Sequence, residues 1–291
     1  MIMPNIDAAR VAGIARFAGA IRRETVKEIA AFGTGHIGGS LSIADVLAVL
    51  YGDVMRVRPD EPRWEDRDWF ALSKGHCAPA LYATLALKGF FPKDWLETLN
   101  RNGTNLPSHA DRLKVPGVDI TAGSLGQGVS VAAGVALAMK IDGRPNRVYA
   151  IVGDGESQEG QVWEMALFAA QHRLDNFTVF LDYNKLQLDG YCKDICDMGD
   201  MAAKFRSFGW YVEDVANGND VESILEAIER SRDHRGDKPA MIVLNTLKGL
   251  GWKAIEGLPK SHSTSIDAEQ REEALRDIDA LTVETVNAVG K

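Results

Sequence analysis

The residues best suited to chemistry follow two apolar runs in the middle of the chain. Gly153-Asp154-Gly155 ends the run 147–152, and Asn184 follows the run 176–181. One helical segment separates these runs, so we expect neighbouring parallel strands whose carboxyl ends meet at one sheet edge. Asp and Asn together offer only oxygen ligands, which suits Mg²⁺ or Ca²⁺. The alternative is two ordinary turns, because Asp-Gly and Asn are common turn residues.

Four of the six histidines stand in loops that contain glycine or serine: His36, His76, His109 and His262. Neutral imidazoles in such loops can hydrogen-bond phosphate or hydroxyl groups and can transfer protons near neutral pH. The simpler alternative for any one of them is a surface or structural histidine. The glycine-rich turn 123–128 opens a helix of small residues, but its glycines do not follow the order of a dinucleotide-binding fingerprint.

The elements that must hold these residues alternate along the chain between strands and helices. This alternation predicts an α/β fold, in which one domain, 1–291, contains a parallel sheet with helices on both faces. Ser42 and Asp45 have the spacing of a capping box that would open a helix at 46–51. We expect strands at 69–72, 147–152, 176–181, 210–215 and 240–245, and helices at 8–32, 160–172, 221–232 and 267–289.

The composition of the chain argues against several classes of protein. The net charge of −8 argues against a nucleic-acid binder, which usually has a basic face. No stretch approaches the roughly 20 apolar residues that span a bilayer, so no membrane association is expected. The first ten residues have no apolar core of a secretory signal, and three cysteines make no disulfide framework. These features predict a cytoplasmic protein.

Several stretches resemble one family. Gly153-Asp154-Gly155 followed after 28 residues by Asn184 is similar to the thiamine-diphosphate motif. The sequences around it, and others in the same order along residues 10–265, look specifically like transketolase. They read GHIGGS at 35–40, LSKGH at 72–76, PSH at 107–109, AGSLGQG at 122–128, GDGESQEG at 153–160 and LDYNKLQ at 181–187. The resemblance implies the diphosphate-binding domain of a thiamine-diphosphate fold.

The resemblance also implies roles for individual residues. Asp154, Asn184 and the Leu186 carbonyl would bind Mg²⁺ (or Ca²⁺). His36, His109 and His262 would face the sugar and shuttle protons at its hydroxyls. Glu159 would lie at the subunit interface. The residues that would contact thiamine diphosphate are His76, Gly123, Ser124, Leu125, Gly155, Asn184 and His262.

Part of the family's machinery has no counterpart in this sequence. In transketolases, the glutamate that activates the aminopyrimidine ring lies in a second domain, after the diphosphate domain. We therefore expect a C-terminal partner subunit that carries the pyrimidine domain, an α₂β₂ assembly, and ketol transfer between sugars or sugar phosphates. Two alternatives stay open: an α subunit of a 2-oxo-acid dehydrogenase, and a cofactor-binding subunit with no catalysis of its own.

Overall fold

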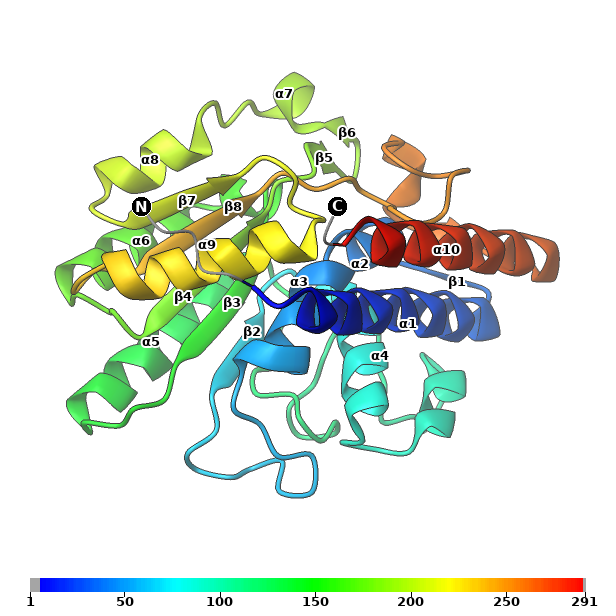
Figure 1. Cartoon of the computed structure of the whole chain (residues 1–291), viewed down its shortest axis with the longest axis horizontal. Coiled ribbons are helices and arrows are strands. Elements are labelled where there is room, and N and C mark those ends of the chain that lie inside the picture. Colours follow the sequence, from blue (N-terminus) through cyan, green and yellow to red (C-terminus); the bar gives the residue numbers. More distant parts are fainter. Residues whose placement is uncertain (1–5, 290–291) are drawn as a thin grey trace.

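A parallel sheet of five strands forms the centre of the computed structural model, which describes residues 6–289 (Figure 1). Residues 1–5 and 290–291, which the expected domain 1–291 includes, lie outside the described residues. In spatial order the strands are β2 (Trp69–Leu72), β3 (Val148–Gly153), β4 (Phe177–Asp182), β8 (Ala240–Leu244) and β7 (Tyr211–Val215). All four pairings are parallel. The expected strands and the α/β class are therefore confirmed.

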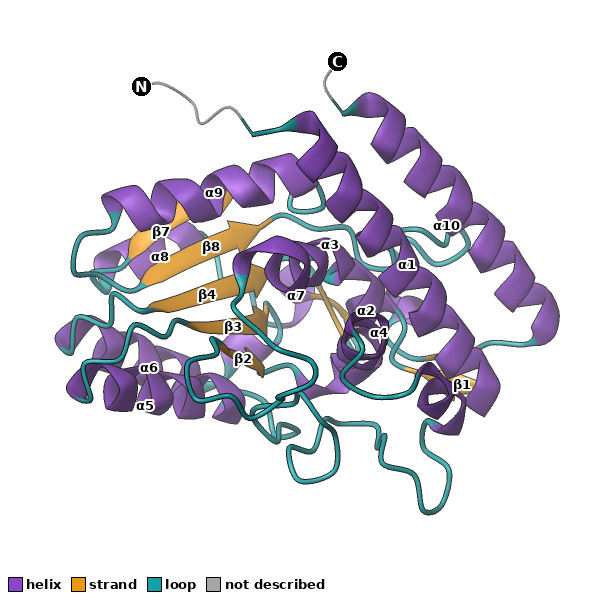
Figure 2. Cartoon of the chain, turned by 60° about the horizontal axis from the view of Figure 1, so that its bottom comes forward, coloured by secondary structure: helices purple, strands orange, loops and turns teal. Residues whose placement is uncertain are grey.

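Helices cover both faces of the sheet, because the central strands are apolar on both sides. Along β3, Tyr149 and Ile151 point into one core, and Ala150 and Val152 point into the other. Figure 2 shows the helices α5 and α6 on one side of the strands and α9 on the other. The first core contains residues from α1 (Ala8–Phe32), α3 (Ala44–Val49), α4 (Ala78–Lys88) and α9 (Val221–His234); the second contains residues from α5 (Gln127–Ile141), α6 (Gly160–Gln171) and α8 (Met201–Ser207).

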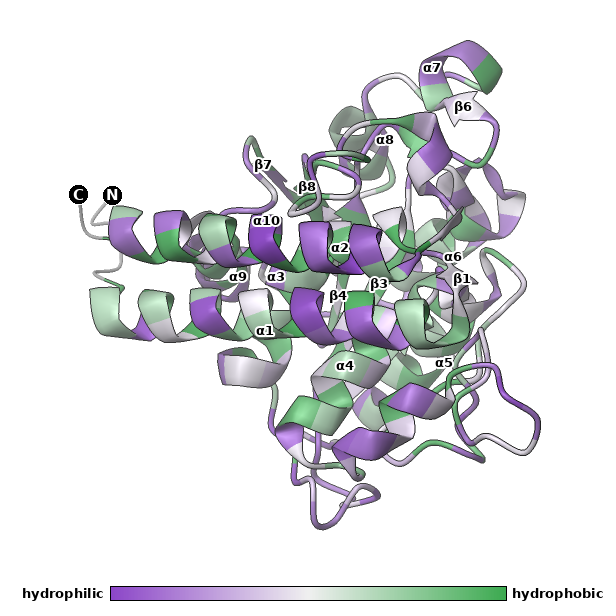
Figure 3. Cartoon of the chain, turned by 90° about the vertical axis from the view of Figure 1, so that its right-hand side faces the viewer, coloured by the Kyte–Doolittle hydropathy of each residue, from purple (hydrophilic) through white to green (hydrophobic). Residues whose placement is uncertain are grey.

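The long helix α1 and the last helix, α10 (Ala268–Ala288), lie side by side and antiparallel (Figures 1 and 3). Asp7 caps α1 at its start, and Gly33 ends it at φ 99°, a left-handed conformation that favours glycine. Gly19 allows the two helices to approach closely, since a Cβ there would lie 2.2 Å from the hydroxyl oxygen of Thr282. A capping box at Asp267 begins α10, close to the expected helix 267–289.

The predicted capping box at Ser42 is wrong. Ser42 ends the short helix α2 (Gly38–Ser42), and α3 begins at Ala44 with no side-chain cap. The Ser42 hydroxyl lies 2.7 Å from a carboxylate oxygen of the buried Asp182 and 3.0 Å from the Gly39 carbonyl. A buried carboxylate needs such donors, and this need decides where the hydroxyl points.

Short elements complete the chain and join distant loops. The strand β1 (Thr34–Gly35) pairs with β9 (Thr264–Ser265), and β5 (Leu186–Gln187) pairs with β6 (Gly190–Tyr191), both antiparallel. The remaining helical turns are Leu50–Val54, Gly75–Cys77, Lys93–Thr98, Glu156–Gln158, α7 (Cys192–Ile195) and Pro259–Ser261. No helix within residues 6–289 has the length and apolar character needed to cross a membrane.

Candidate active site

A cavity of about 410 Å³ lies at the carboxyl edge of the sheet, where the loops after β2, β3, β4 and β8 meet. Nearly all the residues that the sequence predicted for the site line this cavity. Ser124 is the exception, because it is exposed and does not line the cavity. The predicted residues that do line it are His36, His76, His109, Gly123, Leu125, Asp154, Gly155, Glu159, Asn184, Leu186 and His262.

The four predicted histidines form one cluster. The His36 ring lies 5.3 Å from His76, 6.0 Å from His109 and 5.4 Å from His262, measured between ring centroids. His76 and His262 are 5.0 Å apart. Segments more than 200 residues apart in the sequence therefore meet in one cavity. Rings this close suit neutral imidazoles, since protonating one disfavours the charge on its neighbours.

Burial keeps these imidazoles uncharged. It lowers the pKa of all four rings, and neighbouring charges strengthen the effect for three of them. For His262, burial and then the Lys248 ammonium lower the pKa to about 3. For His76, burial and then Lys74 hold the pKa far below its usual range. A neutral imidazole can both donate and accept a hydrogen bond, as contact with a hydroxyl requires.

Two long-range contacts bring His262 to this cluster. The pairing of Gly35 with Thr264 fixes the segment after His262 against the segment before His36. The His262 Nδ1 atom also lies 3.2 Å from the Nζ atom of Lys248, which is buried. Local sequence around His262 contains neither partner.

Asp154 and Asn184 converge as their strand ends predicted, because β3 and β4 are neighbours and Gly153 pairs with Asp182. The Asp154 carboxylate accepts hydrogen bonds from the backbone amides of Gly155, at 2.8 Å, and Lys185. The Asn184 side-chain oxygen accepts one from the Leu186 amide at 3.0 Å. Burial, and then the nearby Asp182 carboxylate, raise the pKa of Asp154 to about 6. A cation beside Asp154 would relieve this cost.

The donor set at this corner fits a hard cation. It offers a carboxylate, an amide oxygen and the Leu186 carbonyl, the oxygen types that Mg²⁺ and Ca²⁺ prefer. The Lys248 Nζ atom now donates to the Leu186 carbonyl at 3.1 Å, so a bound ion would have to take over that contact. Among residues 6–289, no three His, Cys, Asp or Glu side chains are arranged to hold a metal. Any ion here therefore depends on amide, carbonyl and ligand oxygens.

A buried ion pair under the cavity was not predicted from the sequence. The Lys74 ammonium donates to the Asp182 carboxylate, and both side chains are at most 2% exposed. Burial opposes the charge on Lys74, but the Asp182 carboxylate outweighs it and raises the pKa of the ammonium. Asp182 also accepts hydrogen bonds from the hydroxyls of Ser42 and Thr246 and from the Asn184 amide at 2.8 Å. The pair thereby positions Asn184.

Glu156 is a second positioning residue that the sequence did not reveal. Its buried carboxylate accepts the Ser73 hydroxyl at 2.5 Å, the Gly126 amide at 2.9 Å and the Gly153 amide at 3.0 Å. It therefore joins the loops after β2 and β3 to the glycine-rich turn. Close packing also requires Gly75, where a Cβ would lie 2.8 Å from backbone atoms of Ala122.

Comparison with known proteins shows which family this chain resembles. A family model described as "Transketolase, thiamine diphosphate binding domain" matches residues 14–279. The 6-deoxy-6-sulfo-D-fructose transketolase subunit SqwG of Clostridium sp. (strain MSTE9) is 49% identical over 262 residues, covering 90% of this chain and 94% of that protein. An apulose-4-phosphate transketolase subunit of Phocaeicola vulgatus is 40% identical over 257 residues, covering 88% and 90%.

This chain spans less than half the length of several other transketolases that it matches. Human transketolase is 32% identical over 273 residues, which are 94% of this chain and 43% of that protein. The solved transketolase of Campylobacter jejuni superimposes with a TM-score of 0.84 at 27% identity, covering 98% of this chain and 46% of the other. A Pichia stipitis transketolase in complex with sedoheptulose 7-phosphate gives the same TM-score at 28% identity, covering 95% and 44%.

Proposed function

The chain belongs to the transketolase family through its thiamine-diphosphate-binding domain, and we propose that it is one subunit of a two-chain transketolase. In this proposal it binds the diphosphate end of the cofactor, and a partner subunit supplies the pyrimidine domain. The single observation that carries it is the cavity in which four neutral histidines face the Asp154–Asn184 corner. Relatives of matching length are themselves named as subunits.

The cofactor's place follows from the chemistry of the cavity wall. We assign Mg²⁺ to the oxygens of Asp154, Asn184 and Leu186, where it would balance the diphosphate. His76, Asn184 and backbone at Gly155 and Gly123 would hold the phosphate oxygens, with Ser124, Leu125 and His262 around the rest of the cofactor. When bound, thiamine diphosphate supplies a carbanion for breaking and forming carbon–carbon bonds.

The histidines would act on the sugar. We propose that His36, His109 and His262 hydrogen-bond the substrate hydroxyls and hold or return their protons during ketol transfer. Their lowered pKa values favour the neutral ring, so each can accept a hydrogen bond from a substrate hydroxyl. A cavity with several such groups favours a polyhydroxylated substrate over a simple 2-oxo acid. The relatives' names point to sulfonated or phosphorylated ketoses as the substrate class.

We propose an α₂β₂ assembly in the cytoplasm. Glu159, the residue just before α6, is exposed, and the exposed apolar side chains of Val131, Leu167 and Phe168 lie on the adjoining helices α5 and α6. Such a surface suits contact with a second copy. All three cysteines are free thiols, as is usual in a reducing compartment.

The test is a reconstitution with the C-terminal partner. We expect the complex, supplied with thiamine diphosphate and Mg²⁺, to transfer a ketol unit from a sulfonated or phosphorylated ketose to an aldose acceptor. Decarboxylation of 2-oxo acids in place of ketol transfer would favour the dehydrogenase alternative. Tight cofactor binding with neither activity would favour a non-catalytic subunit.

A further inference from the structure

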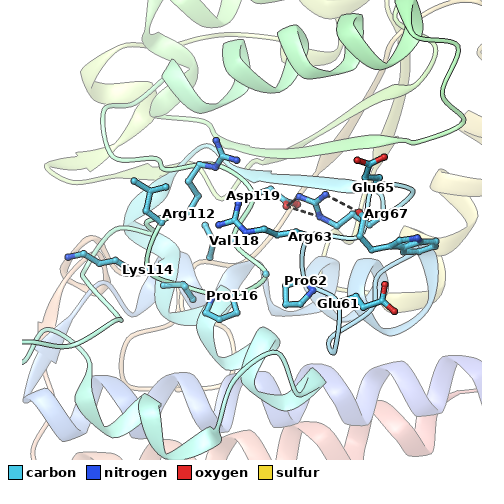
Figure 4. A pocket seen from close by; sticks show the side chains of 14 residues that line it. Glu61, Pro62, Arg63, Glu65, Arg67, Arg112, Lys114, Pro116, Val118 and Asp119 are labelled. Atoms are coloured by element: carbon cyan, nitrogen blue, oxygen red, sulfur yellow. Dashed lines mark hydrogen bonds and ion pairs between the residues drawn. The ribbon is translucent and has the colours of Figure 1, made fainter.

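A second cavity, of about 640 Å³, lies between the loops 61–67 and 112–119. It shares no lining residue with the catalytic cavity. Figure 4 shows the two loops facing each other, with Arg63 and Arg67 from one and Arg112 and Lys114 from the other. The volume is that of a site for a small metabolite.

Cations in this cavity outnumber the anions that could pair with them. Two of its three acidic residues are already engaged, since Glu61 pairs with Arg58 and Asp119 pairs with Arg67. Arg63, Arg112 and Lys114 are exposed, and no carboxylate within residues 6–289 lies within 4 Å of their charged groups. The third acidic residue, Glu65, has no cationic partner among the described residues, so three unpaired cations face one unpaired carboxylate. The lining therefore carries a net positive charge, in a chain of net charge −8.

The walls of this cavity are fixed without a ligand. The buried Asp119 carboxylate accepts the Arg67 Nε at 3.2 Å and the backbone amide of Phe70 at 3.0 Å, and so ties the 112–119 loop to strand β2. The Arg67 guanidinium lies over the Trp69 ring at 4.7 Å. At the base of the loop, the Ala122 amide donates to the Ala110 carbonyl at 3.2 Å. The two loops are therefore held in place before a ligand binds, which lowers the ordering cost of binding.

Apolar groups line the space between the cations. Val115 and Val118 are buried, and Pro62 and Pro116 also line the cavity. We propose that this cavity binds a small organic anion, with a phosphate or sulfonate head against Arg63 and Arg112 and a less polar body against the valines and prolines. Guanidinium groups match the geometry of such oxyanions and donate several hydrogen bonds to each. The proposal does not depend on the transketolase activity.

Calorimetric titration of the full chain with phenyl phosphate tests the proposal, with phenyl sulfonate and neutral phenol as companion probes. We expect saturable binding of both anions at one site and none of phenol. The double variant Arg63→Ala/Arg112→Ala should bind phenyl phosphate at least about tenfold more weakly, because each lost guanidinium removes charge-assisted hydrogen bonds. Both residues are exposed, so unfolding midpoints should stay unchanged and confirm an intact fold.

The matched control removes two exposed arginines elsewhere, in the variant Arg16→Ala/Arg206→Ala. It lowers the total charge equally and should leave affinity for phenyl phosphate unchanged. Equal affinity in the wild type and the Arg63/Arg112 variant would place the binding in another part of the chain and overturn the proposal. An equal loss in both double variants would reduce the effect to net charge and overturn it too, as would the absence of saturable binding.

Discussion

The two cavities of this chain hold their charges in opposite ways. Under the catalytic cavity, Lys74 and Asp182 are buried and paired, and further hydrogen bonds satisfy the carboxylate. Around the second cavity, Arg63 and Arg112 are exposed and have no carboxylate partner among the described residues. Burial makes charge part of the folded structure in the first case, while exposure leaves it available to a ligand in the second. The same side-chain chemistry is part of the folded structure in one place and, in our proposal, part of a ligand site in the other.

The largest expected effect concerns the histidine cluster, whose half-buried rings we propose to contact the sugar substrate. His36→Ala or His109→Ala in the reconstituted complex should lower kcat/KM for the sugar substrate by about 10²–10⁴-fold, the usual loss for a proton-transfer group. Cofactor affinity should stay nearly constant. Steady-state kinetics measure the first and titration the second. His234→Ala, on exposed surface, serves as the control. Wild-type turnover in both cavity variants would remove these histidines from the mechanism.

The buried pair should be costly to break. Lys74→Met leaves the Asp182 carboxylate without its cation, and the free energy of unfolding should fall by about 3–5 kcal/mol. Denaturant titration monitored by circular dichroism gives this value. Lys140→Ala, which breaks an exposed pair with Asp175, should cost less than about 1 kcal/mol. Arg63→Ala should cost less than about 0.5 kcal/mol. Similar losses in all three variants would erase the contrast between the two cavities.

Asp154 is buried, as Lys74 and Asp182 are, and it also lines the candidate active-site cavity. Asp154→Asn removes a full charge from the proposed metal site, so the affinity for thiamine diphosphate with Mg²⁺ should fall at least about tenfold. Calorimetric titration of the complex measures the change. Asp142→Asn, on exposed surface, is the matched control. Unchanged affinity in the Asp154 variant would exclude its carboxylate from the metal site.

The last prediction concerns how the stability of the chain depends on pH. The pKa of His262 is about 3 in the folded chain and about 6.5 when unfolded, so below pH 6.5 the unfolded state binds more protons. Stability should therefore fall as the pH drops below 6.5, by up to about 1.4 kcal/mol per pH unit from this residue. Urea unfolding of the isolated chain at pH 7.5, 6.0 and 5.0 should show a shallower fall in His262→Gln. Parallel curves for the two proteins would contradict the lowered pKa.

Local sequence was enough to predict the frame of the site. Apolar runs and strand–helix alternation gave the five parallel strands, and strand adjacency predicted that Asp154 would meet Asn184. These features depend on short periodic patterns and on the ordering rules of parallel sheets. The same strand order determines which loops lie next to one another at the carboxyl edge of the sheet.

Long-range partners explain what the sequence could not predict. The Ser42 hydroxyl points to Asp182, 140 residues away, and so does not cap the next helix. Lys74 pairs with the same carboxylate across 108 residues, and Glu156 reaches both Ser73 and the Gly126 amide. In each case a buried polar group is satisfied by whatever the fold brings near it. A single sequence does not show which residues, far apart along the chain, will lie close together in the fold.

In the proposed function, this chain acts only together with a second subunit. The direct measurement is ketol transfer from hydroxypyruvate or a ketose phosphate by the purified chain, saturated with thiamine diphosphate and Mg²⁺, with and without the C-terminal partner. We predict no turnover by the chain alone, because in our proposal the partner subunit supplies the glutamate that activates the aminopyrimidine ring, and turnover together with an α₂β₂ mass once the partner is added. Robust ketol transfer by the isolated chain would contradict this account.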